Sequence, residues 1–274
     1  MESDKLYRVK KEDLPKLEEL LNICFAHDPL YETLIPDPDV RKRLMPELFH
    51  CDMDEFYETC EIFADSEELN SVLVVSDETE SYNLFHFLLT EAKATLQNDL
   101  YLIKEDPSFH TFYNFIKGGD YLNSSWTQQL HQTKRLHIIY LAVHPRMQHH
   151  GMAAMLMDEA IRYAQEHGMM ISLETHNEKN LEFYKKFQFK EYGILKKNFK
   201  SETILSDPGI SVRVCFTKRG ICYMMYNTQK RGPVISEISA SEYFVEASIR
   251  RDCVLNTLSN TLFNPCSIPC STPR

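Results

Sequence analysis

Apolar residues in the first third of the chain recur at spacings that predict two helices and a hairpin. After Asp13, leucine and cysteine return every three or four residues, which predicts a helix from 14 to 25. A second helix is predicted to begin at Asp37, with a kink or a junction at Pro46. The runs 61–64 and 71–75 flank an acidic turn and predict a β-hairpin.

Residues 78–133 differ from the rest of the chain in their many aromatic side chains. Their spacing is helical in pieces, and the glycine pair at 118–119 predicts a break. We interpret the segment as a helical insertion. The rings have a simpler alternative role, as the insertion's own core.

The second half of the chain alternates strands and helices. The near-continuous apolar run 137–143 predicts a strand buried on both faces. A helix is predicted from Met152 to His167, where Gly168 ends it. The remaining elements are predicted as a strand at 169–175, a helix at 177–187, and strands at 189–196, 211–216 and 221–227. The pattern decays beyond about 230, so residues 231–274 are expected to be a poorly ordered tail, apart from one marginal helix at 242–258.

Charge is uneven along the sequence. The chain of 274 residues has 30 basic and 40 acidic residues and a net charge of -10, which argues against a nucleic-acid partner. Residues 1–100 hold 24 Asp and Glu against 9 Lys and Arg. Such a surface attracts cations, amines among them, although its simpler role is solubility.

The apolar runs and the cysteines of the sequence predict where the protein is located and whether it binds a metal. The first residues lack the apolar run of a secretory signal, and 138–143 is far too short to span a bilayer, so no membrane association is expected. The 8 cysteines are scattered without a CxxC pair. We therefore expect reduced thiols, a cytoplasmic protein and no metal site.

The segment 143–153 has the features of an anion-binding turn. A strand ends at His144-Pro145, and a helix follows that starts with Gly151 and Ala153. Its first backbone N–H groups and the helix dipole favour a phosphate, and these small residues allow close approach. Gln148 can add a donor, and Arg146, His149 and His150 can add positive charge. A tight turn without a ligand is the alternative.

Two patterns give this half of the chain a family resemblance. The run from Val143 to Ala153 resembles the Q/R-x-x-G-x-G/A signature of the GNAT superfamily of N-acetyltransferases. The run from Asn177 to Phe189 resembles the second GNAT signature, N-x-x-A-x-x-x-Y-x-x-x-G-F, with Gln188 in place of the glycine. Within the superfamily, 173–175 and 180–184 are most similar to the puromycin N-acetyltransferase-like group. The resemblance is specific over 136–196 and weaker over 6–76.

The resemblance implies an α/β (α+β) GNAT acyl-CoA N-acyltransferase fold: a mixed, mostly antiparallel twisted sheet flanked by helices. The acetyltransferase domain would span 1–230, with 78–133 capping the acceptor site. Acetyl-CoA would be the co-substrate. The residues implied in binding it are Leu141, Ala142 and Val143 through their backbone, and Gln148, His149, His150, Gly151, Met152, Ala153, Asn177 and Asn180. Both asparagines are alternatively helix caps.

Acyl transfer to an amine also requires an acid and a base. The resemblance implies that Tyr184 protonates the leaving thiolate; its alternative role is a core tyrosine. His137 and Glu174 are rival candidates for the base, because a free aliphatic amine is only about 1 part in 2,500 neutral at pH 7. A strand histidine is more often a satisfied core residue. Asp28 and Tyr31 are candidates for contact with the acceptor, or simply a helix-ending turn.

The predicted function is acetyl-CoA-dependent N-acetylation of a primary amine on a small molecule, by direct attack in a ternary complex, in a monomer or homodimer. Acetylation of a protein lysine or N-terminus is the alternative among enzymes. A non-catalytic acyl-CoA-binding module is the alternative outside them.

Overall fold

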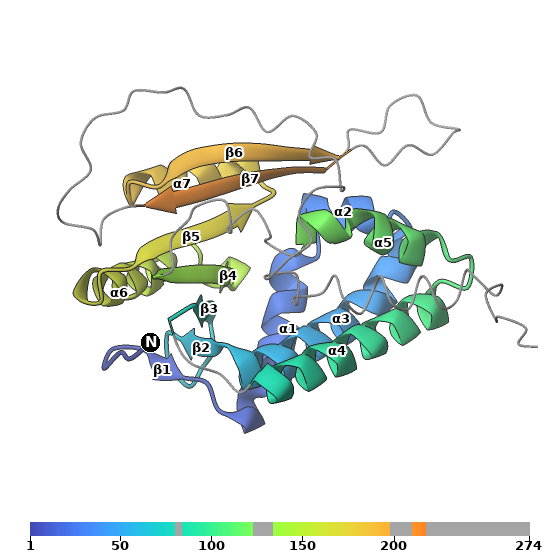
Figure 1. Ribbon diagram of the computed structural model, residues 1–274, viewed down its shortest axis with the longest axis horizontal. Coiled ribbons are helices and arrows are strands. Elements are labelled where there is room, and N and C mark those ends of the chain that lie inside the picture. The colour runs from blue at the N-terminus through green and yellow to red at the C-terminus, as the bar shows by residue number, and fades with distance from the viewer. Residues whose placement is uncertain (80–83, 123–133, 198–209, 218–274) are drawn as a thin grey trace, which may run out of the picture.

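The computed structural model describes residues 1–79, 84–122, 134–197 and 210–217, and its centre is a seven-stranded sheet (Figure 1). The strand order is β1-β2-β3-β4-β5-β7-β6, and every neighbouring pair is antiparallel except β4 with β5. The strands are β1 (Tyr7–Arg8), β2 (Glu61–Ala64), β3 (Ser71–Asp77), β4 (Arg135–Val143), β5 (Met170–Thr175), β6 (Lys190–Lys197) and β7 (Ile210–Thr217). The predicted hairpin is confirmed as β2–β3. The predicted strand 221–227 and the segment 231–274 lie outside the described residues.

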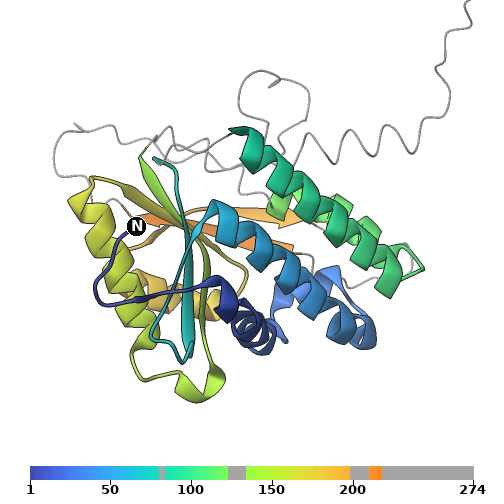
Figure 2. The ribbon, with the colours of Figure 1, turned by 90° about the horizontal axis from the view of Figure 1, so that it is seen from below.

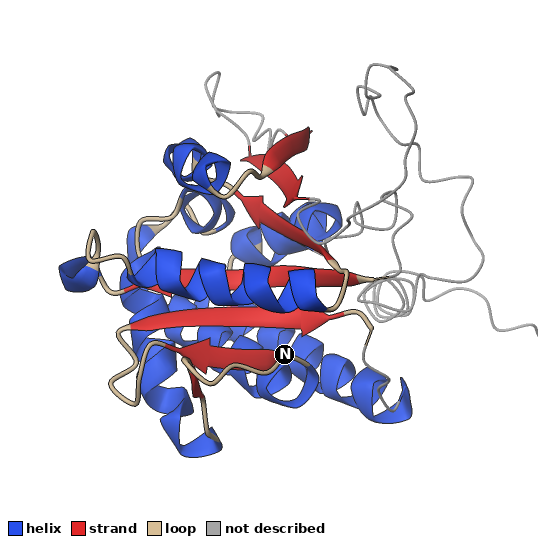
Figure 3. Cartoon of the chain, turned by 90° about the vertical axis from the view of Figure 1, so that its left-hand side faces the viewer, coloured by secondary structure: helices blue, strands red, loops and turns tan. Residues whose placement is uncertain are grey.

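Helices cover both faces of this sheet (Figure 2). They are α1 (Leu14–Phe25), α2 (Pro29–Leu34), α3 (Pro38–Thr59), α4 (Leu84–Glu105), α5 (His110–Leu122), α6 (Met152–Glu166) and α7 (Leu181–Lys186). One apolar core joins α1, α2 and α3 to the sheet, and a second joins α6 and α7 to its other side. Figure 3 shows the strands from the side on which α6 lies. The predicted fold class, a mostly antiparallel sheet flanked by helices, is confirmed.

The predicted junction at Pro46 and the predicted break at Gly118-Gly119 are wrong, while a kink at Pro46 stays a prediction. Pro46 lies inside α3, which is continuous, and α5 continues through Gly118 and Gly119. In α3 the large side chains around the proline, Leu44, Met45, Leu48 and Phe49, are all buried. Packing of this face offsets the cost of one missing backbone hydrogen bond.

The helices α4 and α5 pack beside α3 and α2 (Figure 1). α5 is held to α2 by a buried hydrogen bond, in which Asn114 Nδ2 donates to the backbone oxygen of Leu34 at 3.0 Å. The end of α4 is held to α3 by the exposed guanidinium of Arg43, whose Nε lies 3.1 Å from Glu105 Oε2. These contacts place both helices over the same side of the sheet as α1 and α3.

The parallel strands β4 and β5 separate part of the way along their length. They pair only over Arg135–Ile138 with Met170–Leu173. Beyond that point β4 continues alongside β3, while Glu174 and Thr175 of β5 pair with β7. Among the described residues, no strand lies on the β5 side of the end of β4.

A β-bulge lies at the separation point. Tyr140 is opposite Val74 and Ile138 is opposite Val75, so Ile139 is the extra residue. In a regular strand residues 138 and 140 would share a face. Here Ile138 packs in the core under α6, and Tyr140 packs against the core under α1 and α3. The bulge therefore turns Tyr140 to the side covered by α1–α5.

Candidate active site

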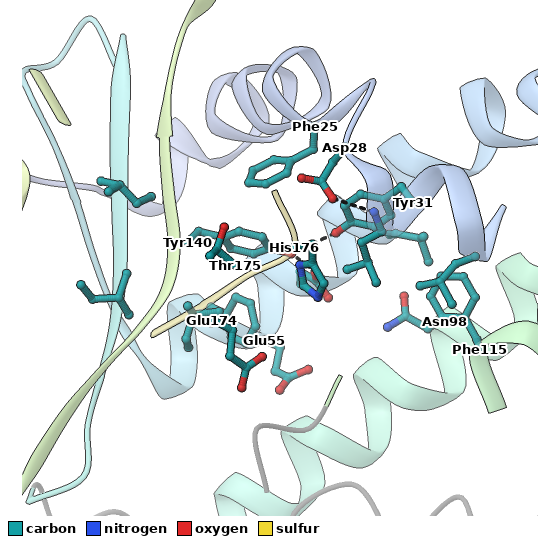
Figure 4. A pocket seen from close by; sticks show the side chains of 18 of the residues that line it. Phe25, Asp28, Tyr31, Glu55, Asn98, Phe115, Tyr140, Glu174, Thr175 and His176 are labelled. Atoms are coloured by element: carbon teal, nitrogen blue, oxygen red, sulfur yellow. Dashed lines mark hydrogen bonds between the residues drawn. The ribbon is translucent and has the colours of Figure 1, made fainter. Parts of the chain in front are cut away.

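A cavity of about 280 Å³ lies where β4 and β5 separate (Figure 4). The sheet contributes residues 137–141 and 174–175 to its walls, α1–α3 contribute a second wall, and α4 and α5 close a third. Seven of the residues singled out from the sequence line this one cavity, although they are distant in the chain. They are Asp28, Tyr31, His137, Leu141, Glu174, Asn180 and Tyr184.

The candidate general acid, Tyr184, is held rigidly in its wall. The side chain is buried, and its ring packs edge-on against Phe183 at 5.4 Å and tilted against Phe189 at 5.9 Å. The next turn contains Gln188 with a φ of 64°, a left-handed conformation that glycine adopts without strain. The glutamine in place of the signature glycine therefore costs about 1 kcal/mol or more at the helix end, and leaves the tyrosine in place.

The two candidate bases differ in their surroundings. His137 is buried, and its Nδ1 lies 2.8 Å from the Oγ of Ser172, the residue opposite it on β5. Glu174 follows on β5 beyond the last pair with β4, and its carboxylate points into the cavity in Figure 4. The strand separation therefore exposes Glu174 to the cavity, while His137 lies in the paired part of the ladder.

Asn177 and Asn180, the two candidate asparagines, have different contacts. Asn177 accepts a hydrogen bond from the backbone N–H of Lys179 at 3.1 Å, which is its alternative role as a cap. Asn180 lines the cavity, and its Nδ2 lies 3.5 Å from Thr175 Oγ1.

The two predicted acceptor residues differ in their hydrogen bonds, and Tyr31 belongs to a set that the sequence did not indicate. Asp28 caps α2 by accepting the backbone N–H of Leu30 at 2.9 Å, and burial raises the pKa of its carboxyl. The Tyr31 hydroxyl lies 3.3 Å from the Tyr140 hydroxyl, which donates to Asp52 Oδ2 at 2.7 Å. Burial raises the pKa of Tyr140 well above its usual value, so this phenol keeps its proton.

Several lining residues were missed by sequence reasoning. Tyr140 lies within the apolar run 137–143, so nothing in the sequence distinguished it from its neighbours. Asp52 and Glu55 lie on α3 among the buried residues Met53 and Phe56, so acidic residues within the apolar pattern were an available signal. Asn98 and Asp99 lie on α4, where the aromatic composition of the insertion gave no hint of them.

His176, the residue after β5, has a buried imidazole in the cavity lining. Burial lowers the pKa of its imidazole to about 4, and its Nε2 atom is buried without a hydrogen-bond partner in the described part of the chain. The ring is therefore neutral at physiological pH, and in Figure 4 it lies in the middle of the cavity.

Replacing Asp99 with asparagine is expected to stabilise the fold at neutral pH. Burial raises the pKa of Asp99 from 3.8 to about 6, so the folded state binds the proton more tightly than the unfolded state. Ionisation therefore destabilises the protein as pH rises from about 4 to 6. The shift corresponds to roughly 3 kcal/mol, which solvent screening of this partly exposed group reduces to about 1 kcal/mol.

Urea unfolding at pH 7 and pH 4 tests this expectation. The free energy of unfolding of Asp99→Asn should exceed that of the parent at pH 7 and equal it at pH 4. Asp54→Asn is the matched control, since Asp54 is an acidic residue on α3 outside the cavity lining. A gain of the same size at both pH values would contradict the assigned cause.

The candidate phosphate turn lies outside the cavity lining, at the far end of β4. Gly151 has a φ of 84° and precedes the first residue of α6, which has no side-chain cap. A Cβ built on Gly151 would have no neighbour within 4 Å, so the space beside this residue is open at the start of α6, where the first backbone N–H groups have no partner within the helix. These features fit an anion such as the diphosphate of a nucleotide.

The other turn residues are exposed, and some of their polar atoms have partners. Gln148 Nε2 donates to the Val143 oxygen at 3.3 Å, so the predicted extra donor is bonded to the strand. His150 Nδ1 lies 2.8 Å from the Gln148 oxygen, and His149 has a φ of 66°. Met152 and Ala153 begin α6 and are half-buried.

The ladder geometry decides which backbone groups of β4 face the gap. The N–H of His144 donates to the Asn70 oxygen on the β3 side at 2.8 Å. Because antiparallel pairing alternates, the N–H groups of Leu141 and Val143 face away from β3, while Ala142 pairs with Val72. Of the three residues predicted to hold a ligand through their backbone, Leu141 and Val143 therefore have N–H groups that face the gap, and the contact with a ligand stays a prediction.

The described residues contain neither a candidate metal site nor a candidate membrane-spanning helix. No group of three or more His, Cys, Asp or Glu in the described ranges has a geometry that could hold a metal ion. No helix within these ranges is long and apolar enough to cross a membrane.

Comparison with known proteins adds a family match. Residues 44–189, which include the cavity's sheet wall and the glycine turn, match the acetyltransferase (GNAT) family. The search for similar curated proteins found no match. The puromycin N-acetyltransferase-like grouping stays a prediction.

Three solved structures illustrate the structural similarity. A histone acetyltransferase and related acetyltransferase from Corynebacterium glutamicum is 16% identical, with 81% of this chain and 98% of that chain covered and a TM-score of 0.49. A polyamine N-acetyltransferase from Drosophila melanogaster is 14% identical, with 77% and 98% covered and a TM-score of 0.44. The ribosomal-protein-S18-alanine N-acetyltransferase from Escherichia coli is 11% identical, with 81% and 98% covered and a TM-score of 0.42. At these values the likenesses carry no argument about substrate.

Proposed function

This chain belongs to the acetyltransferase (GNAT) family and is an N-acetyltransferase, and from this premise we propose that it acetylates a primary amine of a small molecule in a ternary complex with acetyl-CoA. One observation carries the proposal. The cavity at the β4–β5 separation is lined by Tyr184, by Glu174 and by Leu141 at the inner end of the β4 backbone that does not pair with β5.

Backbone groups from the start of α6 back along β4 are suited to successive parts of acetyl-CoA, from its diphosphate to its pantetheine arm. The N–H groups at the start of α6 and the open space at Gly151 suit its diphosphate. The backbone groups of Leu141 and Val143, which face away from β3, suit the amide groups of the pantetheine arm. Bound this way, the group supplies an activated acetyl carbon at the cavity.

Three residues of the chain then act on the reaction. The N–H of Leu141 or Val143 polarises the thioester carbonyl, a donor typically worth about 2.7–4 kcal/mol of barrier. Glu174 takes the proton of the attacking amine, directly or through a water, because its carboxylate points into the cavity while His137 is bonded to Ser172. Tyr184 donates its proton to the sulfur as the C–S bond breaks and the C–N bond forms.

The helices α4 and α5 support a small acceptor. Asn98 and Asp99 of α4 and Phe115 and Ile116 of α5 line the cavity, so this segment would enclose a small molecule. We place these helices within the insertion at 78–133, in an acetyltransferase domain at 1–230. That boundary stays a prediction, since residues 218–274 are outside the described ranges.

Release of free thiol from acetyl-CoA tests the proposed function. The protein should release thiol in the presence of at least one amine of a panel of small primary amines. Tertiary amines of the same size are the control, because they have no N–H to lose. Tight CoA binding with no thiol release from any amine would contradict the proposal and would support a non-catalytic acyl-CoA-binding module.

A further inference from the structure

The cavity has an excess of negative charge. Carboxylates reach it from four elements or their ends: Asp28 before α2, Asp52 and Glu55 on α3, Asp99 on α4, and Glu174 on β5. Among the described lining residues there is no Lys or Arg, and the only basic side chains are those of His137 and His176. Several carboxylates in one cavity raise the cost of burying any one of them that has no counter-charge of its own.

Hydrogen bonds from neutral groups do not remove this charge. Asp28 accepts a backbone N–H, and Asp52 accepts the hydroxyl of Tyr140. His176 has a depressed pKa and is neutral at pH 7. It therefore neither compensates the carboxylates nor repels an incoming cation.

The α4 wall holds two acceptors with no partner in the described part of the chain. Asn98 Oδ1 is buried and has no hydrogen-bond donor. Asp99 is the adjacent residue, and no hydrogen bond or ion pair accompanies its burial, which by itself accounts for its raised pKa. Both residues line the cavity. An unsatisfied amide oxygen and an unneutralised carboxylate on one wall are complementary to an alkylammonium group, which has only donors and carries a positive charge.

This α4 wall and the proposed proton acceptor, Glu174 on β5, belong to different elements of the cavity lining. In Figure 4 Asn98 lies across the cavity from Glu174, with His176 between them. The space between the walls is lined by apolar side chains such as Leu102 and Ile116 as well as by polar groups. One amine at Glu174 therefore leaves the α4 wall open to a second group, with an aliphatic chain between the two.

We propose that the acceptor is a diamine or polyamine, with one amino group acetylated beside Glu174 and Tyr184 and a second ammonium group bound by Asn98 and Asp99. This inference rests on the proposed function and adds the substrate class to it. A monoamine that reacts beside Glu174 would leave Asp99 and Asn98 without a partner. It would therefore bind more weakly and react more slowly than a diamine.

Paired amines test the substrate class. Putrescine and n-butylamine have the same chain length and differ by one amino group. With the full chain, kcat/KM for putrescine should exceed that for n-butylamine by about tenfold to hundredfold, the range of a hydrogen bond to a charged group. A series of longer straight-chain diamines, each with its monoamine, would locate the best spacing.

Variants then test the assigned residues. Asp99→Asn should lower kcat/KM for putrescine by about tenfold or more and lower it for n-butylamine by much less, so that most of the preference for putrescine is lost. Asp54→Asn removes one carboxylate that does not line the cavity, and it serves as the control. This variant should keep the preference for putrescine over n-butylamine. Calorimetric titration with putrescine alone should show weaker binding to Asp99→Asn, and this readout does not depend on catalysis.

The outcomes separate the two proposals. Equal kcat/KM for putrescine and n-butylamine, or an equal loss for both in Asp99→Asn, would overturn the second-ammonium site and leave the acetyltransferase function intact. Absence of thiol release with every amine would overturn both.

Discussion

Replacing Tyr184 with phenylalanine is expected to lower kcat by about 10²- to 10⁴-fold, the usual contribution of a general acid. The ring should stay in place, because its contacts with Phe183 and Phe189 do not involve the hydroxyl. The KM for acetyl-CoA should change little. Without the phenol, the sulfur would have to leave as a thiolate, or take its proton from water.

Tyr163→Phe is the matched control for this variant. Tyr163 is also a buried tyrosine, and its hydroxyl donates to Asp77 Oδ2 at 3.0 Å, but it lies on α6 outside the cavity lining. This change should cost about 1 kcal/mol of stability and leave kcat unchanged. If both variants kept the parent kcat, Tyr184 would be a core tyrosine and the proposed mechanism would lose its acid.

Replacing Gly151 with alanine is expected to raise the KM for acetyl-CoA by about tenfold to hundredfold, because the ligand and the new methyl group would compete for the same space. The protein itself has no atom within 4 Å of that methyl group. Backbone strain at a φ of 84° adds a stability loss of about 1–2 kcal/mol.

Gly168→Ala separates these two effects. Gly168 lies just past the other end of α6 and has a φ of 63°, so alanine there causes similar strain. The melting temperatures of both variants should fall, while only Gly151→Ala should lose acetyl-CoA affinity in calorimetric titration. Equal affinities in the two variants would show that the glycine turn does not hold the diphosphate.

Much of the chain's local structure was predictable from sequence. The predicted helix from Met152 to His167 and the predicted strands at 61–64, 71–75 and 137–143 correspond to α6, β2, β3 and β4, with ends that differ by no more than two residues. Departures came where packing outweighs local preference. The buried side chains around Pro46 keep α3 continuous, and α5 continues through its two glycines.

The candidate site was only partly predictable. The turn at Gly151 and the segment containing Tyr184 are contiguous runs, so their patterns are visible in sequence. The acidic lining as a whole was not predictable, because Asp28 before α2, the acidic residues of α3 and Asp99 on α4 are distant in sequence and share one cavity only in the folded chain. The aromatic composition of residues 78–133 indicated helices but gave no sign of the acceptors on α4.

The sequence by itself determined the order of strands and helices, the glycine turn and the position of Tyr184, because each depends on neighbours a few residues away. The tertiary structure decided which side chains share the cavity. The bulge at Ile139 is set by the register between β3 and β4, and it decides that Tyr140 faces Asp52. Strand register depends on contacts between residues distant in the chain, and no local pattern specifies it.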